Sequence, residues 1–350
     1  MSHSQTAKSQ TATSQNAGWL DQVREDALEP DLAIIDPHHH LWDRNTSFIQ
    51  NRYLMDEIQD DLGSGHNVVS TVFVECDSMY RADGPEALRP VGEVEFVNGI
   101  AAMAASGGYG RTQVAKAIIG HADLLLGADV KAVLEALQAA APERFRGIRF
   151  IGAWLEDKAV FTPPRVPGPG VYLDAKFREG FAQLAPLGLV FEAAIRHPQL
   201  PDFLDLARAF PDTCMVLDHI GGVVGVGTYA GRRDEIFASW RADMAAIARD
   251  CPNVVVKLGA LNMTYCGFGW EKRPLPPTSE DLAAAYRPYY EAVIELFGPE
   301  RCMFESNFPV DKVSCSYAVL WNAFKRMTAA YAPAERAALF HDTAARVYRI

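Results

Sequence analysis

The chain has 350 residues, of which 49% are hydrophobic and 22% charged, as in ordinary globular proteins. It holds 33 Lys and Arg against 44 Asp and Glu, a formal net charge of -11, which disfavours non-specific binding to nucleic acid or an anionic membrane surface. A small-molecule partner is favoured instead. Because the sequence has no apolar run of the roughly 20 residues that a spanning helix needs and no secretory signal pattern, we expect a cytoplasmic protein.

The N-terminal residues differ in composition from the rest of the chain. Residues 1–18 are dominated by Ser, Thr, Gln and Ala, which supply too little apolar surface to offset the entropy cost of ordering, so a disordered tail is predicted. Residues 19–350 are predicted to form one domain. A short helix is expected over 19–28, where the apolar residues fall on one face. The six cysteines show no C-x-x-C spacing and are interpreted as reduced core residues.

Eight apolar or β-branched runs alternate with stretches of helical periodicity. The predicted strands lie at 32–40, 68–75, 115–122, 145–152, 189–195, 213–221, 253–261 and 302–309. The clearest predicted helices lie at 129–141, 200–210 and 240–250. Eight such units match the size of a (β/α)8 barrel of the α/β class, and their regular repetition favours a closed barrel over a doubly wound sheet.

Nearly every predicted strand ends in a side chain capable of chemistry, and barrel enzymes assemble their sites at that end from several strands. These side chains are His38 and His40, Glu75, His121, Arg149, Glu192, His219, Lys257, and Glu305 with Asn307. Three long connections rich in Gly or Pro, 162–174, 221–233 and 262–279, are interpreted as substrate loops or lids, with insertions that have no role as the alternative.

Three consecutive histidines end the first predicted strand, in the sequence IIDPHHHLWD. A strand alternates its faces, so His38 and His40 share one face with Asp36, while His39 points the other way. Two imidazoles about 7 Å apart along a strand can converge on one metal ion or one substrate oxygen. We therefore interpret His38 and His40 as functional and His39 as structural.

The motifs DPHHHLWD, VLDHIGG, NVVVKLGAL and ESNFPVD resemble the amidohydrolase superfamily, in its amidohydrolase-2 branch, from residue 31 to residue 350. That branch includes 2-pyrone-4,6-dicarboxylate lactonase, sugar-lactone hydrolases and decarboxylases. The resemblance implies a (β/α)8 barrel, with His38 and His40 at the first-strand ligand positions and His219 at the sixth-strand histidine. The tryptophan of HLWD favours the lactonases over the decarboxylases.

The eighth predicted strand departs from the family pattern, because G-S-D-x-P is replaced by E-S-N-F-P. Asn307 cannot act as a general base and is a poor ligand for zinc. Glu305 lies on the same strand face, one layer deeper. It is predicted either to supply the displaced base or to form a buried pair with Arg149 or Lys257. Asp311 is the other candidate base.

Hydrolysis of a lactone needs a polarised carbonyl, an activated water and a group that bears the developing negative charge. The leading prediction requires no cofactor: His38, His40 and His219 donate hydrogen bonds to the carbonyl oxygen. The alternative is one divalent metal ion, zinc or manganese, on the same three histidines. Substrate contacts are predicted from Arg149, Glu75, His121, Glu192, Lys257 and Arg196, with Arg165 a further candidate, and the arginines and the lysine could clamp a substrate carboxylate.

The predicted function is therefore a hydrolase that opens a small, anionic, carboxylated lactone. Two alternatives stay open at this point: a metal-dependent non-oxidative decarboxylase on the same fold, and a catalytically inactive binding protein. Neither nucleic acid nor a membrane is an expected partner, and a homo-oligomer is compatible with the sequence.

Overall fold

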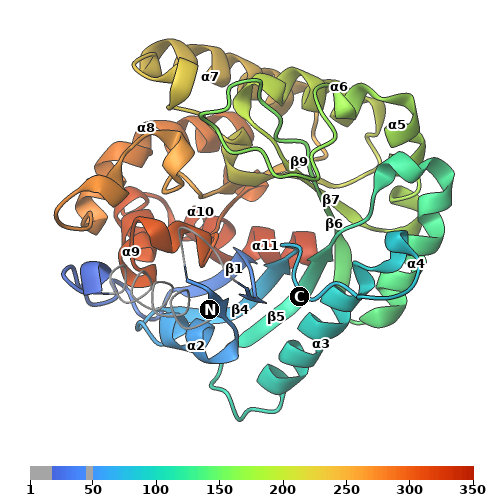
Figure 1. Cartoon of the computed structure of the whole chain (residues 1–350). Coiled ribbons are helices and arrows are strands. Elements are labelled where there is room, and N and C mark those ends of the chain that lie inside the picture. The colour runs from blue at the N-terminus through green and yellow to red at the C-terminus, as the bar shows by residue number, and fades with distance from the viewer. Residues whose placement is uncertain (1–17, 45–49) are drawn as a thin grey trace, which may run out of the picture.

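The computed structural model describes residues 18–44 and 50–350. Within these residues eight parallel strands form one sheet, in the order β1-β4-β5-β6-β7-β8-β9-β10 (Figure 1). The strands are β1 (Ala33–His39), β4 (Asn67–Val74), β5 (Gln113–Gly120), β6 (Phe145–Ile151), β7 (Val190–Ala194), β8 (Met215–Leu217), β9 (Val254–Leu258) and β10 (Cys302–Phe304).

The two edges of the sheet meet, which closes it into a barrel. His39 forms a parallel bridge with Phe308, just beyond β10. The amide of His40 donates to the carbonyl of Phe308 at 2.8 Å, and the amide of Asn307 donates to the carbonyl of His38 at 2.9 Å. The predicted (β/α)8 barrel is therefore confirmed, and its closure places the histidines of β1 beside the residues that follow β10.

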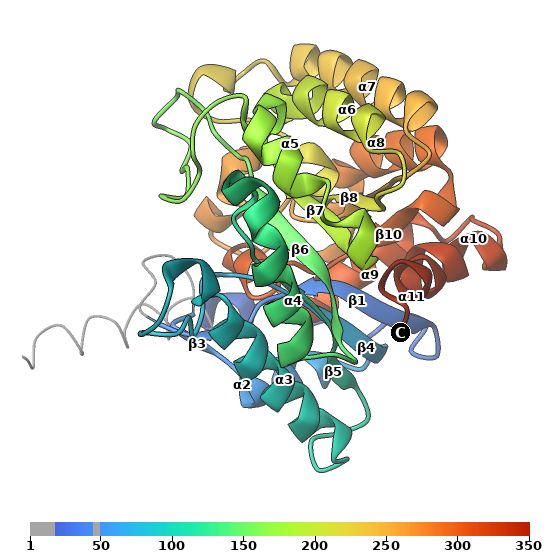
Figure 2. The ribbon, with the colours of Figure 1, turned by 90° about the vertical axis from the view of Figure 1, so that its right-hand side faces the viewer.

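Helices surround the barrel, as Figures 1 and 2 show from two directions. They are α2 (Met55–Leu62), α3 (Val91–Ala105), α4 (Val130–Ala140), α5 (Ala175–Phe181), α6 (Leu200–Ala209), α7 (Arg233–Asp250), α8 (Ser279–Phe297), α9 (Tyr317–Met327), α10 (Pro333–Ala337) and α11 (Thr343–Tyr348). A short antiparallel pair, β2 (Trp42–Asp43) and β3 (Arg52–Tyr53), follows β1. No helix of the described part of the chain is long and apolar enough to cross a membrane.

Alternation along the strands divides the apolar core into two layers. Residues such as Ile34 and Phe73 pack outward against the helices, whereas Ile35 and Val72 point into the barrel. α11 contributes Tyr348 to the inner cluster. The barrel interior is thus apolar apart from the ionisable residues that form the site described below.

The predicted helix over 19–28 is wrong, because the chain leaves helical geometry after Leu20. Its second half is instead bound to α9: the Leu28 amide donates to the Asn322 side chain at 2.8 Å, and Lys325 Nζ donates to the Leu28 carbonyl at 2.7 Å. Helix α7 begins earlier than predicted, at Arg233. The predicted tail falls almost entirely on residues 1–17, which lie outside the described residues. All six cysteines are free thiols, and five of them are buried.

Candidate active site

Three histidines meet at the carboxyl end of the barrel strands. The ring of His38 lies 4.9 Å from that of His40 and 4.7 Å from that of His219, measured between centroids. His40 is fixed by a 2.7 Å contact between its Nδ1 and the Val74 carbonyl. His39 points away from this cluster, with its Nε2 2.8 Å from the Thr71 hydroxyl. The structure therefore brings together the three histidines that the sequence singled out and separates His39 from them.

A tight turn after β8 carries His219 into the site. His219 and Ile220 have φ angles of 57° and 49°, in the left-handed region that side chains rarely adopt. Gly222 follows with φ 65°, and a Cβ there would lie 2.2 Å from the carbonyl oxygen of Ile195. This turn lets two adjacent residues, Asp218 and His219, both face the other site residues instead of alternating as they would on a strand.

Glu305, just beyond β10, links two of the histidines. Its Oε1 lies 2.6 Å from Nδ1 of His219, and its Oε2 lies 2.7 Å from Nδ1 of His38. Gly259 makes room for it, since a Cβ at that position would lie 2.3 Å from the Glu305 Cγ. The predicted pairing of Glu305 with Arg149 or Lys257 is not what the structure has, because both cations have other carboxylate partners.

Lys257 on β9 is paired with Glu192 on β7, with Nζ to Oε2 at 2.6 Å. Its ammonium also lies 3.4 Å from Oδ1 of Asp218 and 3.2 Å from Nδ1 of His38. The other oxygen of Glu192 accepts a 2.5 Å hydrogen bond from the Tyr348 hydroxyl. Lys257, Glu192 and Asp218 are completely buried, so this cluster is a charged network in the barrel interior.

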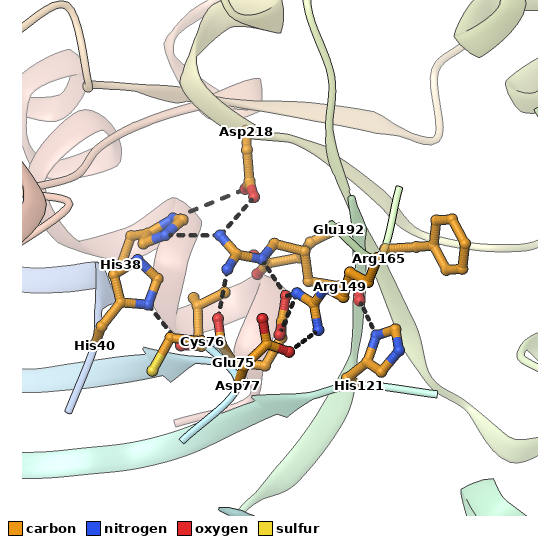
Figure 3. A network of polar contacts seen from close by, with 12 residues as sticks. His38, His40, Glu75, Cys76, Asp77, His121, Arg149, Arg165, Glu192 and Asp218 are labelled. Atoms are coloured by element: carbon orange, nitrogen blue, oxygen red, sulfur yellow. Dashed lines mark hydrogen bonds and ion pairs between the residues drawn. The ribbon is translucent and has the colours of Figure 1, made fainter. Parts of the chain in front are cut away.

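Arg149 on β6 forms the second charged contact with the histidines (Figure 3). Its Nε donates to Glu75 Oε1 at 2.8 Å, and one of its terminal nitrogens lies 3.4 Å from Nε2 of His38. Arg165, from the long loop after β6, binds the same Glu75 at 2.5 Å and Asp77 at 2.6 Å. The predicted substrate-binding cations Arg149 and Arg165 are thus both neutralised by carboxylates of the protein.

Burial sets the protonation of the site. It raises the pKa of Glu305 to about 8 and that of Asp218 to about 7, although Lys257 opposes both shifts. Burial also lowers the pKa of His219 to about 3 and that of His38 well below its ordinary value, in each case with a further lowering from neighbouring cations. The imidazoles are therefore uncharged at neutral pH, while the two carboxyl groups can exchange protons near neutral pH.

The predicted site residues Asn307 and Asp311 form a second, separate contact. Asn307 Nδ2 donates to Oδ1 of Asp311 at 2.9 Å, and Asn262 Nδ2 donates to its Oδ2 at 3.2 Å. Burial raises the pKa of Asp311 well above its ordinary value. Because both of its oxygens are bound by amides, Asp311 faces Asn307 and Asn262 instead of the three histidines.

A cavity of about 740 Å³ opens beside the site, over the ends of β4, β5 and β6. Its walls include His121, Phe150, Tyr80 and Arg165. His121 is held by a 3.3 Å contact between its Nδ1 and the Arg149 carbonyl. Arg165 belongs both to this cavity and to the Glu75 contact, so its side chain stands between the cavity and the charged network.

His38, Asp218 and His219 offer ligand atoms within 4.8 Å of one another, close enough to share a metal ion. The charges around them fit such an ion poorly. The Lys257 ammonium lies against both His38 and Asp218, and the Arg149 guanidinium lies against the remaining ring nitrogen of His38. A divalent ion there would face two fixed positive charges at contact distance.

Sequence reasoning missed three residues of this region. Asp218 could have been found, since it precedes His219 in the VLDHIGG motif. Tyr348 and Tyr265 gave no signal, because one lies in the C-terminal helix and the other within a long loop. Tyr265 lies under Arg196, whose guanidinium carbon is 3.9 Å from the centre of the tyrosine ring.

Comparisons with known proteins agree with this architecture. The family model described as amidohydrolase, from the amidohydrolase-2 branch, matches residues 35–350. The uncharacterized protein y4mH of Sinorhizobium fredii is 33% identical over 338 residues, which cover 91% of this chain and 99% of the relative. An L-fucono-1,5-lactonase of Burkholderia multivorans is 32% identical over 178 residues, 51% of this chain and 57% of the relative.

The fold also matches solved structures. A crystal structure of an amidohydrolase from Burkholderia multivorans with bound zinc superposes with a TM-score of 0.68 at 24% sequence identity. The match covers 91% of this chain and 99% of that one. At this level of identity the likeness supports the barrel fold.

Proposed function

Since the chain belongs to the amidohydrolase family, in its amidohydrolase-2 branch, we propose that it opens a small lactone ring by hydrolysing the ester bond. The observation that carries the proposal is the contact of Glu305 with Nδ1 of His219 at 2.6 Å. When a carboxylate binds one ring nitrogen, the other, Nε2, can accept a proton from water. Histidine bases in hydrolases work in this way. The similarity to an L-fucono-1,5-lactonase supports a lactone as the substrate.

His219 and Glu305 act as one base. Glu305 is completely buried, whereas His219 keeps 8% of its surface exposed, so a water molecule can reach the imidazole but not the carboxylate. With Glu305 ionised, the proton on Nδ1 of His219 is shared with the carboxylate, and Nε2 accepts a proton from water as that water attacks the lactone carbonyl carbon. The carboxylate then stabilises the imidazolium that forms.

Arg149 polarises the carbonyl. Its guanidinium lies at the histidine cluster, and its positive charge and N–H groups stabilise the negative oxygen of the tetrahedral intermediate. The uncharged ring of His40 donates its Nδ1–H to the Val74 carbonyl, so its Nε2 is an acceptor that can orient a hydroxyl group of the substrate. When the ring C–O bond breaks, His219 returns its proton to the leaving alkoxide, and the product is an open-chain hydroxy acid.

No step of this mechanism passes through a metal ion, because Lys257 and Arg149 already contact the atoms of His38 and Asp218 that would bind one. The same two contacts disfavour the alternative function of metal-dependent decarboxylation. The contact between His219 and Glu305 disfavours the other alternative, a catalytically inactive binding protein.

The test is the rate of acid release from a panel of five- and six-membered lactones, followed at constant pH. We expect hydrolysis of at least one lactone by the unmodified protein and a loss of roughly 10²-fold or more in kcat for Glu305→Gln. Glu93→Gln is the matched control. Glu93 is also completely buried, with its pKa raised to about 8 by burial, but it accepts hydrogen bonds from the backbone amides of Cys76 and Ser78 and from no imidazole of the described chain.

The control variant should keep its activity, because a glutamine oxygen accepts the same two amide hydrogen bonds. If Glu305→Gln keeps full activity at every pH, the proposed base is wrong. If no lactone in the panel is hydrolysed, the proposed function itself fails.

A further inference from the structure

Arg196 differs from the other cations near the histidines, because no carboxylate of the described residues neutralises it. Lys257, Arg149 and Arg165 each contact a carboxylate within 2.8 Å. Among the described residues Arg196 forms no ion pair, and its guanidinium makes one long hydrogen bond, 3.4 Å, to the carbonyl of Ile195. Its Nε has no hydrogen-bond partner in 18–44 or 50–350, although the residue is only 8% exposed.

A buried guanidinium without a counter-charge is costly, since burial removes the water that would solvate it. Stacking on an aromatic ring recovers part of this cost. Arg196 lies over the ring of Tyr265, with its carbon 3.9 Å from the ring centre. The Tyr265 hydroxyl is also buried and has no hydrogen-bond partner within the described part of the chain. A cation and a hydroxyl donor therefore stand together with unused hydrogen-bonding capacity.

The position of this pair relates it to the reacting groups. Arg196 follows β7 and Tyr265 follows β9, the two neighbours of β8, and the turn that contains His219 follows β8. The His197 amide donates to the Gly222 carbonyl, and the Gly222 amide donates to the His219 carbonyl at 2.8 Å. Arg196 is thus fixed against the turn that presents His219. Each of Arg196, Tyr265 and His219 keeps a small exposed fraction, 8%, through which a ligand can reach it.

We propose that Arg196 and Tyr265 form a subsite that binds a carboxylate beside His219. A guanidinium binds a carboxylate through two parallel hydrogen bonds, and a phenol donates a third. The inference rests on the proposed lactone hydrolysis, which offers two sources of this group: a carboxylate substituent of the substrate ring, or the carboxylate formed when the ring opens.

Binding can be measured without turnover. Isothermal titration calorimetry compares gluconate, an open-chain hydroxy acid, with sorbitol, which has the same chain and hydroxyls but no carboxylate. We expect the protein to bind gluconate and not sorbitol, and Arg196→Gln to weaken gluconate binding roughly 10- to 100-fold. Arg196→Lys should recover part of the affinity, since it keeps the charge but not the planar fork.

Arg301→Gln is the matched control. Arg301 also lies over an aromatic ring, 5.0 Å from the centre of Phe297, but it precedes β10 at the opposite end of the barrel and binds backbone carbonyls. This variant should bind gluconate as the unmodified protein does. The proposed subsite is wrong if Arg196→Gln binds gluconate as tightly as the unmodified protein does. It is also wrong if the unmodified protein does not bind gluconate at millimolar concentration.

Kinetics of Arg196→Gln distinguish the two sources. If the ring carries the carboxylate, KM rises for carboxylated lactones and stays constant for neutral ones. If the carboxylate is the product's, KM changes little for either and inhibition by the product acid weakens. Unchanged KM together with unchanged product inhibition would contradict the proposal, whereas hydrolysis itself would still support the proposed function.

Discussion

At the scale of a residue, we propose that Glu305 replaces an acidic group that the family pattern has and this chain lacks. The family position for the acidic residue holds Asn307, whose side chain is bound to Asp311. Two residues earlier, Glu305 reaches the histidines from a deeper layer of the barrel, and Gly259 leaves the space for its side chain. The period of two along a strand predicted that Glu305 and Asn307 share a face, but it could not reveal that Glu305 would bind imidazoles, because cross-strand partners are not encoded locally.

The raised pKa of Glu305 predicts a pH-dependent stability. The folded chain keeps this proton up to about pH 8, whereas the unfolded chain loses it near the ordinary value of 4.5. The contribution to stability is therefore complete below pH 4.5 and is lost as the pH rises toward 8. Because Gln cannot lose a proton, the Tm of Glu305→Gln relative to the unmodified protein should rise between pH 5 and pH 8. A constant difference in Tm across this range would refute the shift.

The pair of Lys257 and Glu192 predicts a large stability effect. Both side chains are completely buried, so Glu192→Gln leaves a buried ammonium with less compensation. We expect a loss of about 3 kcal/mol in the free energy of unfolding, measured by urea denaturation. Glu95→Gln, which breaks an exposed pair with Arg81, is the control and should change stability little. Similar losses of unfolding free energy in the two variants would show that burial does not determine how much these ion pairs contribute to stability.

At the scale of elements, the loop that contains Arg165 connects the cavity to the site. The side chain of Arg165 is bound to Glu75 and Asp77 at the end of β4, and Pro167 lines the cavity wall. The sequence predicted a substrate loop at 162–174 from its length and its Gly and Pro content. It gave no means to predict that an arginine of the loop would pair with a carboxylate of another strand.

Arg165→Gln should loosen this loop. Loss of the ion pairs to Glu75 and Asp77 removes the charged contacts that hold the loop against β4, so amide hydrogen exchange over 162–174 should accelerate. Arg178→Gln, which removes an ion pair from α5 to Asp205, is the control and should leave exchange in this loop unchanged. Equal protection of the loop in the unmodified protein and Arg165→Gln would mean that Arg165 does not hold it.

The strands were predictable because their apolar runs are long and end in polar residues. The observed strands end before the predicted ones, most clearly at β8 and β10, because the chain turns outward at His219 and Asn307, both in left-handed backbone geometry. Periodicity does not predict such turns. The helix over 19–28 failed for another reason: contacts with α9, far along the chain, decide its structure.

At the scale of the whole molecule, barrel closure assembles the site. Each strand contributes only one or two side chains to the site. The carboxyl ends of the strands bring Arg149, Lys257 and Glu305 into contact with His38. The sequence predicted this convergence from the positions of polar residues at strand ends. The assignment of charged pairs could not be predicted, because each pair joins residues dozens to hundreds of positions apart.

His219 and Glu305 are proposed to activate water without a metal ion. The most direct measurement is the pH dependence of kcat/KM for lactone hydrolysis by chelator-treated protein, with metal content determined by elemental mass spectrometry and spontaneous hydrolysis subtracted. We expect full activity at a metal content near zero and a rise in rate as the pH passes about 8, the pKa of Glu305. Activity that disappears with the metal and returns only when zinc or manganese is added would contradict it.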